Sequence, residues 1–250
     1  MSRTSAARFL MVLLWVLIAP LSVAAQQSTP LDQTDEEAIR DLVLQTIREN
    51  PEVLVETLLN YQEEAQAAAQ EQQVAAIERV SDALKSDTNA GVIGNPDGEI
   101  VLIEFFDYNC PYCRRAAPIL FELIEDNPDL RIVMREWPIL GPDSELAARA
   151  SLAALKQDAF AEFHEELMAQ PRANAVMIRR AAEAAGLDYA RLQSDMEAAD
   201  ITAHIEASRQ AAVDLGISGT PTFLIGETLV PGLLEKPALQ SLITEAANGK

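Results

Sequence analysis

The feature that most constrains the fold is a pair of cysteines three positions apart, in the run Cys110-Pro111-Tyr112-Cys113. An apolar segment, Ile100–Phe106, precedes the pair, and a segment typical of a helix, Arg114–Glu125, follows it. A CxxC at such a strand–helix junction suits thiol–disulfide exchange, because the free N–H groups and the positive dipole end of the helix favour a thiolate at the first cysteine. We therefore expect Cys110 to be the nucleophile.

The chain has no other cysteine, so the two thiols react with each other or with another molecule. A zinc site would need two further nitrogen or sulfur ligands. The two histidines, His164 and His204, lack the short spacing of a zinc hairpin. A purely structural bridge would close too short a loop to remove much entropy from the unfolded chain. We expect a redox pair, with no metal and no organic cofactor.

Residues 1–25 have the pattern of a secretory signal peptide. Arg3 and Arg8 form a basic region, Phe9–Ile18 is an unbroken apolar run, and small residues end at Ala25. The run is shorter than the roughly twenty residues that span a bilayer, although a retained N-terminal anchor is the alternative. We expect cleavage after Ala25 and export across the inner membrane to the periplasm, where a disulfide persists.

The chain is acidic, with a formal net charge of −20. That charge disfavours attraction to nucleic acid phosphates and to anionic membranes. After residue 25, no apolar run approaches the length of a membrane span. We therefore expect no nucleic-acid partner and no membrane insertion of the mature chain.

Residues 26–88 form a predicted helical arm. The pattern is helical from residue 31 to about residue 88, with Asn50-Pro51 ending one helix and starting the next. A long helix with so little to bury should either pack on something or act as a linker. After the proline, apolar side chains recur at alternating spacings of four and three, as in a short coiled-coil seam: Leu54, Leu58, Tyr61, Ala65 and Ala68.

A turn-rich boundary at residues 89–98 opens a second predicted domain, residues 89–250. Strands and helices alternate in it, which indicates an α/β sandwich with a helical insertion at about 143–213. The expected elements are a strand at 100–106, the helix after the CxxC, a strand at 130–134, the insertion, a hairpin at 222–225 and 228–230, and a last helix at 237–246.

Two motifs together carry a resemblance to a known family. VLIEFFDYNCPYCRRAAP, followed about a hundred residues later by SGTPTFLIG, resembles the DsbA family of thioredoxin-fold thiol:disulfide oxidoreductases. The likeness covers about Asn95 to the C-terminus. The arm and the Gly-Thr-Pro motif are most similar to the ScsC-like branch, some of whose members trimerise through that region. The resemblance implies a thioredoxin-like fold, disulfide exchange with substrate proteins, a redox partner in the membrane and a homotrimer through residues 31–88.

The residues between and after the thiols also receive expected roles. Cys113, one turn into the helix, would resolve the mixed disulfide that Cys110 forms with a client. The resemblance implies that Pro111 and Tyr112 help to set the redox potential. Tyrosine stands where the best-known oxidase of the family has histidine and removes a cationic partner for the thiolate. We therefore expect a less extreme oxidant.

Two further positions complete the expected site. Glu104 interrupts a run that is apolar on both faces, which predicts a desolvated carboxylate with a raised pKa. An acid at a sheet edge is the alternative. Similar proteins have a buried acid there that relays the proton of the resolving thiol. Pro221 opens a predicted strand, and the family places a cis-proline beside its CxxC. That geometry leaves the backbone of Thr220 free to pair with an extended substrate.

Other functional classes stay open at this point. Cys-Pro-Tyr-Cys is also the motif of glutaredoxin-like reductases, and a thioredoxin-like reductase would use the same pair of thiols. A non-catalytic interaction protein or holdase would rely on the acidic helical arm instead. The sequence does not decide between oxidase, isomerase and reductase.

Overall fold

The computed structural model describes residues 32–248, so the expected signal peptide and its cleavage site lie outside the described residues. The chain divides into two units, with the boundary between Asn60 and Tyr61. The domain limits expected from composition, at residues 25 and 88, stay predictions.

The first unit is helical. Helix α1 (Gln33–Glu49) begins with a capping box, in which the Asp32 carboxylate accepts a hydrogen bond from the N–H of Asp35 at 2.8 Å. Helix α2 (Pro51–Ser86) starts at the proline, as the Asn50-Pro51 pair predicts, and continues into the second unit. Large apolar side chains of both helices are exposed to solvent, so the described residues of this unit, 32–60, contain no core that would explain the helices.

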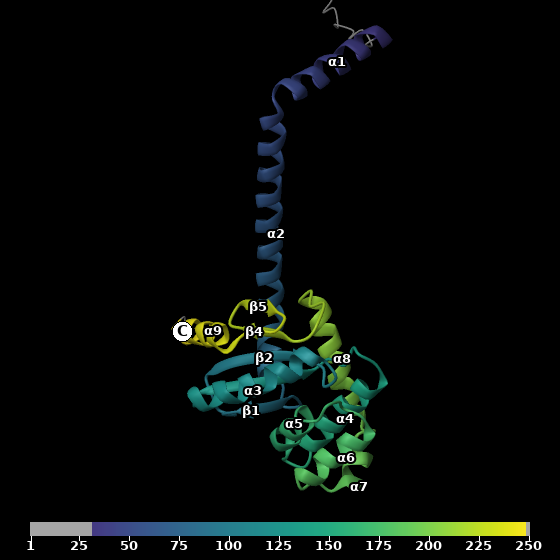
Figure 1. Ribbon diagram of the computed structural model, residues 1–250, viewed down its shortest axis with the longest axis vertical. Coiled ribbons are helices and arrows are strands. Elements are labelled where there is room, and N and C mark those ends of the chain that lie inside the picture. The colour runs from purple at the N-terminus through teal and green to yellow at the C-terminus, as the bar shows by residue number, and fades with distance from the viewer. Residues whose placement is uncertain (1–31, 249–250) are drawn as a thin grey trace, which may run out of the picture. The chain divides into compact units, whose positions relative to one another are not determined.

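The second unit is built on a mixed sheet with the strand order β1-β3-β2-β4-β5 (Figure 1). β2 and β3 are parallel and are connected by α3 (Pro111–Asp126), whereas the other neighbours are antiparallel. The last two strands form the predicted hairpin. This arrangement confirms the predicted thioredoxin-like α/β fold. The strands are β1 (Gly91–Gly94), β2 (Ile100–Phe106), β3 (Leu130–Glu136), β4 (Thr222–Ile225) and β5 (Thr228–Pro231).

Residues 89–98 were expected to be only a turn-rich boundary, but residues 91–94 of this segment form strand β1. Only Val92 and Ile93 in it favour strand, and the glycines on either side have the pattern of a turn. Gly91 has a different role: its lack of a side chain allows the Phe160 ring to pack against the backbone, since a Cβ there would lie 2.0 Å from that ring. The strand exists because it pairs with β3, a partner that a local pattern cannot reveal.

Helices cover both faces of the sheet. Leu102 and Phe106 belong to a core cluster with α3, with the insertion and with α9 (Lys236–Asn248), whereas Ile103 and Phe105 belong to a second cluster with α2 and α8. Because successive strand residues face opposite sides, Glu104 lies on the α3 side of β2. The insertion consists of α4 (Pro142–Leu155), α5 (Phe160–Met168), α6 (Ala175–Ala184), α7 (Tyr189–Asp195) and α8 (Ala199–Asp214).

The C-terminal part of α2 belongs to the core of the second unit. Ala76, Ile77 and Leu84 are buried in the same cluster as Phe105. This anchoring distinguishes the end of α2 from its exposed beginning. Within residues 32–248, no helix combines the length and the apolar character needed to cross a membrane.

Candidate active site

The CxxC lies at the start of α3, where the sequence predicts it. Cys110 is the N-cap residue, with extended backbone (φ −75°, ψ 120°), and Pro111 occupies the first turn, where its missing N–H costs little. The N–H of Arg114 donates to the Cys110 carbonyl at 3.1 Å and so closes the first helical turn. Cys113 lies within that turn, and both cysteines are free thiols.

The two thiols differ in exposure and acidity. Cys110 retains 4% of its accessible surface and Cys113 retains none. A hydrogen bond from the Cys113 thiol lowers the pKa of Cys110 to about 5, helped by the Thr220 side chain and by the N–H groups of Cys113 and Tyr112, and opposed by burial. Burial, followed by the bond to Cys110, raises the pKa of Cys113 well above its ordinary value. At neutral pH, therefore, Cys110 is a thiolate and Cys113 keeps its proton.

Glu104 is buried at 1% exposure, opposite Met134 of β3 and Phe223 of β4. Its Oε1 makes no hydrogen bond within residues 32–248. Burial, and after it the charge of Cys110, raises the pKa of Glu104 well above 4.5. The charge of Glu104 in turn raises the pKa of Cys113. The predicted desolvated carboxylate is thus confirmed, and it is electrostatically coupled to both thiols.

The loop before β4 lies against the nucleophile. The Thr220–Pro221 peptide bond is cis, as the resemblance implies. The Cys110 sulfur lies 3.2 Å from the Thr220 carbonyl oxygen, to which the protonated thiol donates a hydrogen bond. Two sites separated by 110 residues in sequence are therefore in direct contact. Tyr112 lies on the outer side of the CxxC turn and is 55% exposed.

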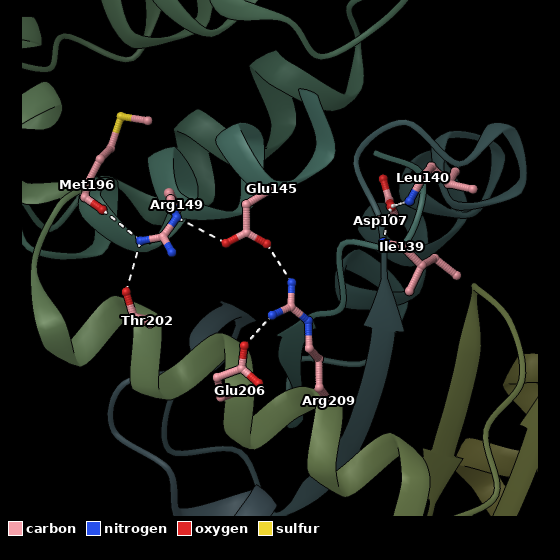
Figure 2. A network of polar contacts seen from close by, with 9 residues as sticks. All are labelled: Asp107, Ile139, Leu140, Glu145, Arg149, Met196, Thr202, Glu206 and Arg209. Atoms are coloured by element: carbon pink, nitrogen blue, oxygen red, sulfur yellow. Dashed lines mark hydrogen bonds and ion pairs between the residues drawn. The ribbon is translucent and has the colours of Figure 1, made fainter. Parts of the chain in front are cut away.

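Two polar residues that the sequence patterns did not reveal hold the turn before Cys110. Asp107 accepts a hydrogen bond from the N–H of Asn109 at 2.7 Å. Figure 2 shows that it also accepts from the N–H groups of Ile139 and Leu140, at 2.8 and 3.0 Å. The Asn109 side chain exchanges bonds with the backbone of Ala173 at 2.9 and 3.0 Å. A signal was available, because an acid directly after an apolar strand is typical of an Asx turn.

The two histidines have partners in the core. The Tyr108 hydroxyl lies 2.9 Å from Nδ1 of His164, and burial lowers the pKa of that histidine to about 3. His204 lies between Glu136, 3.2 Å from its Nε2, and Asp87, 3.3 Å from its Nδ1. Within residues 32–248, neither histidine is part of a group of three side chains that could hold a metal ion.

Comparison with known proteins places this site in a family. The DSBA-like thioredoxin domain matches residues 101–244, more than half of the chain. The chain belongs to the DSBA-like thioredoxin domain family. Its fold is therefore that of the DsbA-like thiol–disulfide oxidoreductases, as the two motifs predict. The CxxC, Glu104 and the cis-proline loop all lie within the matched region.

Solved structures of this family include close neighbours. A thioredoxin-like oxidoreductase from Silicibacter pomeroyi DSS-3 is 48% identical with a TM-score of 0.65, over 67% of this chain and 97% of that chain. Proteus mirabilis ScsC in a transitional conformation is 31% identical with a TM-score of 0.65, over 88% of this chain and 99% of that one. The second match is long enough to include part of the helical arm.

Curated proteins of known sequence also match. Na(+)/H(+) antiporter NhaA 3 from Salinispora tropica is 32% identical over 158 residues, which are 62% of this chain and 24% of the antiporter. The chain thus spans about a quarter of the length of that relative. Disulfide bond formation protein D from Bacillus subtilis is 23% identical over 64% of this chain and 78% of its own length.

The different acidities predict selective labelling. Brief alkylation of the reduced protein at mildly acidic pH should label Cys110 and spare Cys113, because only Cys110 is a thiolate and only Cys110 retains any accessible surface. Peptide mass spectrometry over about pH 4 to 8 should give a labelling rate that rises with an apparent pKa of about 5. In Cys113→Ala, which lacks the thiol donor, that midpoint should move upward. Equal labelling of both cysteines would contradict the geometry.

Proposed function

We propose that the protein is a periplasmic thiol:disulfide oxidoreductase that exchanges disulfides with substrate proteins through Cys110 and Cys113. One observation carries this proposal: a thiolate with a pKa of about 5 lies one helical turn from a buried thiol that keeps its proton. A cysteine pair that formed only a structural bridge would not require two thiols of such different pKa. The secretory pattern of residues 1–25 supports the location, since disulfides persist outside the cytoplasm.

In the oxidising direction, a client thiolate attacks the sulfur of Cys110 in the protein's disulfide. A client–Cys110 disulfide forms, the Cys110–Cys113 bond breaks, and the departing Cys113 thiolate takes a proton from Glu104. A second client thiolate then attacks the client sulfur and releases Cys110 as a thiolate. The client loses two electrons, which the two cysteines gain. A redox partner in the membrane would reoxidise the pair.

In the reducing or isomerising direction, the Cys110 thiolate attacks a client disulfide. Glu104 then serves as the base that deprotonates Cys113, which resolves the mixed disulfide if the client does not rearrange first. The raised pKa of Glu104 suits both roles, because a carboxyl group that titrates well above 4.5 can hold or accept a proton near neutral pH. The backbone of Thr220, beside the nucleophile, offers the edge on which an extended client segment pairs.

The strength of the oxidant follows from the acidity of Cys110. A pKa of about 5 lies between the extremes of CxxC thiols, which run from about 3.5 to 7.5. The Tyr112 side chain supplies no positive charge that would lower the pKa of Cys110 further. Pro111 has no N–H, so the backbone donors that lower this pKa are the N–H groups of Tyr112 and Cys113. These contacts support an oxidant weaker than the strongest of the family.

The arm supports a more specific activity. Leu54, Leu58 and Tyr61 follow one another at spacings of four and three along α2, and they are 52%, 56% and 68% exposed. Exposed apolar side chains at that spacing form the seam of a coiled coil. We infer a homotrimer through residues 31–88. Several active sites facing one client would favour isomerisation, which requires holding a misfolded protein while the Cys110 thiolate attacks.

The proton-relay role of Glu104 predicts a kinetic defect. Glu104→Gln should slow release of the mixed disulfide by on the order of a hundredfold, because a positioned acid–base group contributes at least that much. Stopped-flow exchange with a model peptide should also lose the part of its pH dependence that Glu104 causes. Glu136→Gln is the matched control, since that carboxylate is equally buried but is bonded to Ser151 and His204. A Glu104→Gln profile identical to the native one would remove the relay role.

The trimer predicts that removal of residues 26–60 leaves a monomer that oxidises reduced clients but does not rescue scrambled ones. The truncation stops before Tyr61 because Ala76, Ile77 and Leu84 belong to the core of the second unit. Light scattering at roughly tens of micromolar should show a trimer for the mature chain, since assembly depends on protomer concentration.

A variant with two substitutions tests the same interface without a deletion. Leu54→Glu/Leu58→Glu should dissociate the trimer, because it places charges in the seam. Asn60→Glu/Gln70→Glu adds the same charge to α2 away from the seam and should leave the trimer intact. A mature chain that is monomeric at this concentration would move the preferred function to a simple dithiol oxidase or reductase.

A further inference from the structure

An exposed ion pair lies next to the dithiol turn. Nη2 of Arg172 is 2.8 Å from Oδ2 of Asp143, and the two side chains are 64% and 46% exposed. Arg172 belongs to residues 169–174, which connect α5 to α6, and Asp143 belongs to the first turn of α4. Exposed pairs of this kind contribute little to stability. Either side chain can therefore exchange its partner for another charge at small cost.

Asn109, the residue before Cys110, determines where this pair lies. Its side-chain amide exchanges two hydrogen bonds with the backbone of Ala173, at 2.9 and 3.0 Å, and its Nδ2 donates to Oγ of Ser144 at 3.3 Å. Both of these contacted residues are buried, and they directly follow the two members of the ion pair in the chain. Each member is thus one residue away from a contact of the side chain that precedes the nucleophile.

The connection between α5 and α6 is also held at the other end of the CxxC. Arg114, which follows Cys113, donates from Nη1 to the carbonyls of Leu167 at 3.2 Å, of Met168 at 2.9 Å and of Gln170. The dithiol turn is therefore bonded to this segment on both sides of its two cysteines. Side chains that the segment exposes border the surface on which a client must lie to reach the reacting sulfur.

The two members of the pair differ in what else stabilises them. Asp143 lies at the N-terminal end of α4, where the helix dipole favours a carboxylate even without a partner. Arg172 makes no other hydrogen bond or ion pair within residues 32–248. Arg172 can therefore turn from Asp143 to an incoming carboxylate. The N-terminal end of α3, at Cys110, adds further positive potential for such an anion.

We propose that Arg172 binds a carboxylate of the client beside the cysteine that reacts with Cys110, and that Asn109 is the positioning residue that holds Arg172 there. This inference rests on the proposed function, and the substrate class is a client segment with aspartate or glutamate next to its reacting cysteine. The preference is opposite to that of the net charge of −20, which favours cationic clients. A local contact can prevail, because salt screens charges beyond about 8 Å at physiological ionic strength.

The test compares three reduced dithiol peptides that have aspartate, asparagine or lysine next to the attacking cysteine. The full-length protein in its disulfide form should oxidise the aspartate peptide about tenfold faster than the lysine peptide, because one attraction is gained and one repulsion is avoided. The asparagine peptide should react at an intermediate rate. Each rate is divided by the rate of the same peptide with a small uncharged disulfide, which removes the effect of the added charge on the thiol itself.

Two variants distinguish client binding from a structural role of the ion pair. Arg172→Gln should bring the ratio of the aspartate rate to the lysine rate below one, because Asp143 then faces the client without its partner. Asp143→Asn should raise the ratio above the native value, because Arg172 loses its competing carboxylate. Both variants break the same contact, so a purely structural ion pair would change the ratio in the same direction in both.

Two further variants test the position of Arg172. Asn109→Ala should reduce the ratio towards one, since it releases the backbone beside both members of the ion pair. Arg179→Gln is the matched control, because Arg179 is 63% exposed, pairs with Glu183 at 2.9 Å and lies over the ring of Tyr189. This variant removes the same charge from the chain and should keep the native ratio.

Four results would overturn the inference alone: a native ratio of one or less, a ratio unchanged in Arg172→Gln, a change of the same sign in Asp143→Asn, or an equal loss in Arg179→Gln. A ratio unchanged in folded Asn109→Ala would remove the positioning role. If Asn109→Ala does not fold, the variants of the exposed pair still decide whether Arg172 binds the client. Absence of exchange with all three peptides would instead overturn the proposed function.

Discussion

The hydrogen bond from the Cys113 thiol to the Cys110 sulfur is the interaction on which the rest of this site depends. It has the largest influence on the pKa of Cys110 and lowers it to about 5. The bond requires that Cys113 keep its proton, and burial, together with the charge of Glu104, ensures that it does. The donor exists only while both cysteines are thiols. It therefore stabilises the reduced protein, and the disulfide form has no equivalent interaction. A dithiol whose reduced form is favoured in this way acts as an oxidant.

The sheet brings the other parts of the site to this bond. The register of β2 puts Glu104 on the side that faces α3, and its burial follows from the strands on either side. The antiparallel pairing of β4 with β2 brings Thr220 to the same end of the sheet, against Cys110. The loop that contains Ile139 is bonded to Asp107 at the end of β2. Each contact comes from a different segment, so the fold, rather than any one motif, assembles the site.

Local patterns in the sequence predicted the parts of the structure that depend on neighbouring residues. The CxxC at a strand–helix junction, the hairpin at 222–225 and 228–230 and the burial of Glu104 follow from the local pattern of apolar residues. Strand β1 did not follow, because Gly91 pairs with Met134 and packs on Phe160, both far away in sequence. The role of Asp107 could not be predicted for the same reason: residues 139 and 140, which donate hydrogen bonds to its carboxylate, lie more than thirty residues downstream. The signal peptide, the trimer and the direction of catalysis stay predictions, because they concern residues or partners outside the described chain.

The most direct test is the pH dependence of the unfolding free energy of the reduced protein minus that of the oxidised protein. Because the folded pKa of Cys110 is about 5 and its ordinary value is 9.0, the stabilisation is complete above pH 9 and is lost as pH falls through 5. The difference should therefore rise from about pH 5 to about pH 9, by at most about 1.4 kcal/mol per pH unit and less where solvent screens the thiolate. Groups that titrate alike in both forms cancel. Glu104 reduces the slope, because the Cys110 thiolate raises the pKa of Glu104 in the reduced form alone, and Cys113 opposes the rise only above pH 9. A flat difference across that range would contradict a thiolate stabilised by Cys113 at the start of α3.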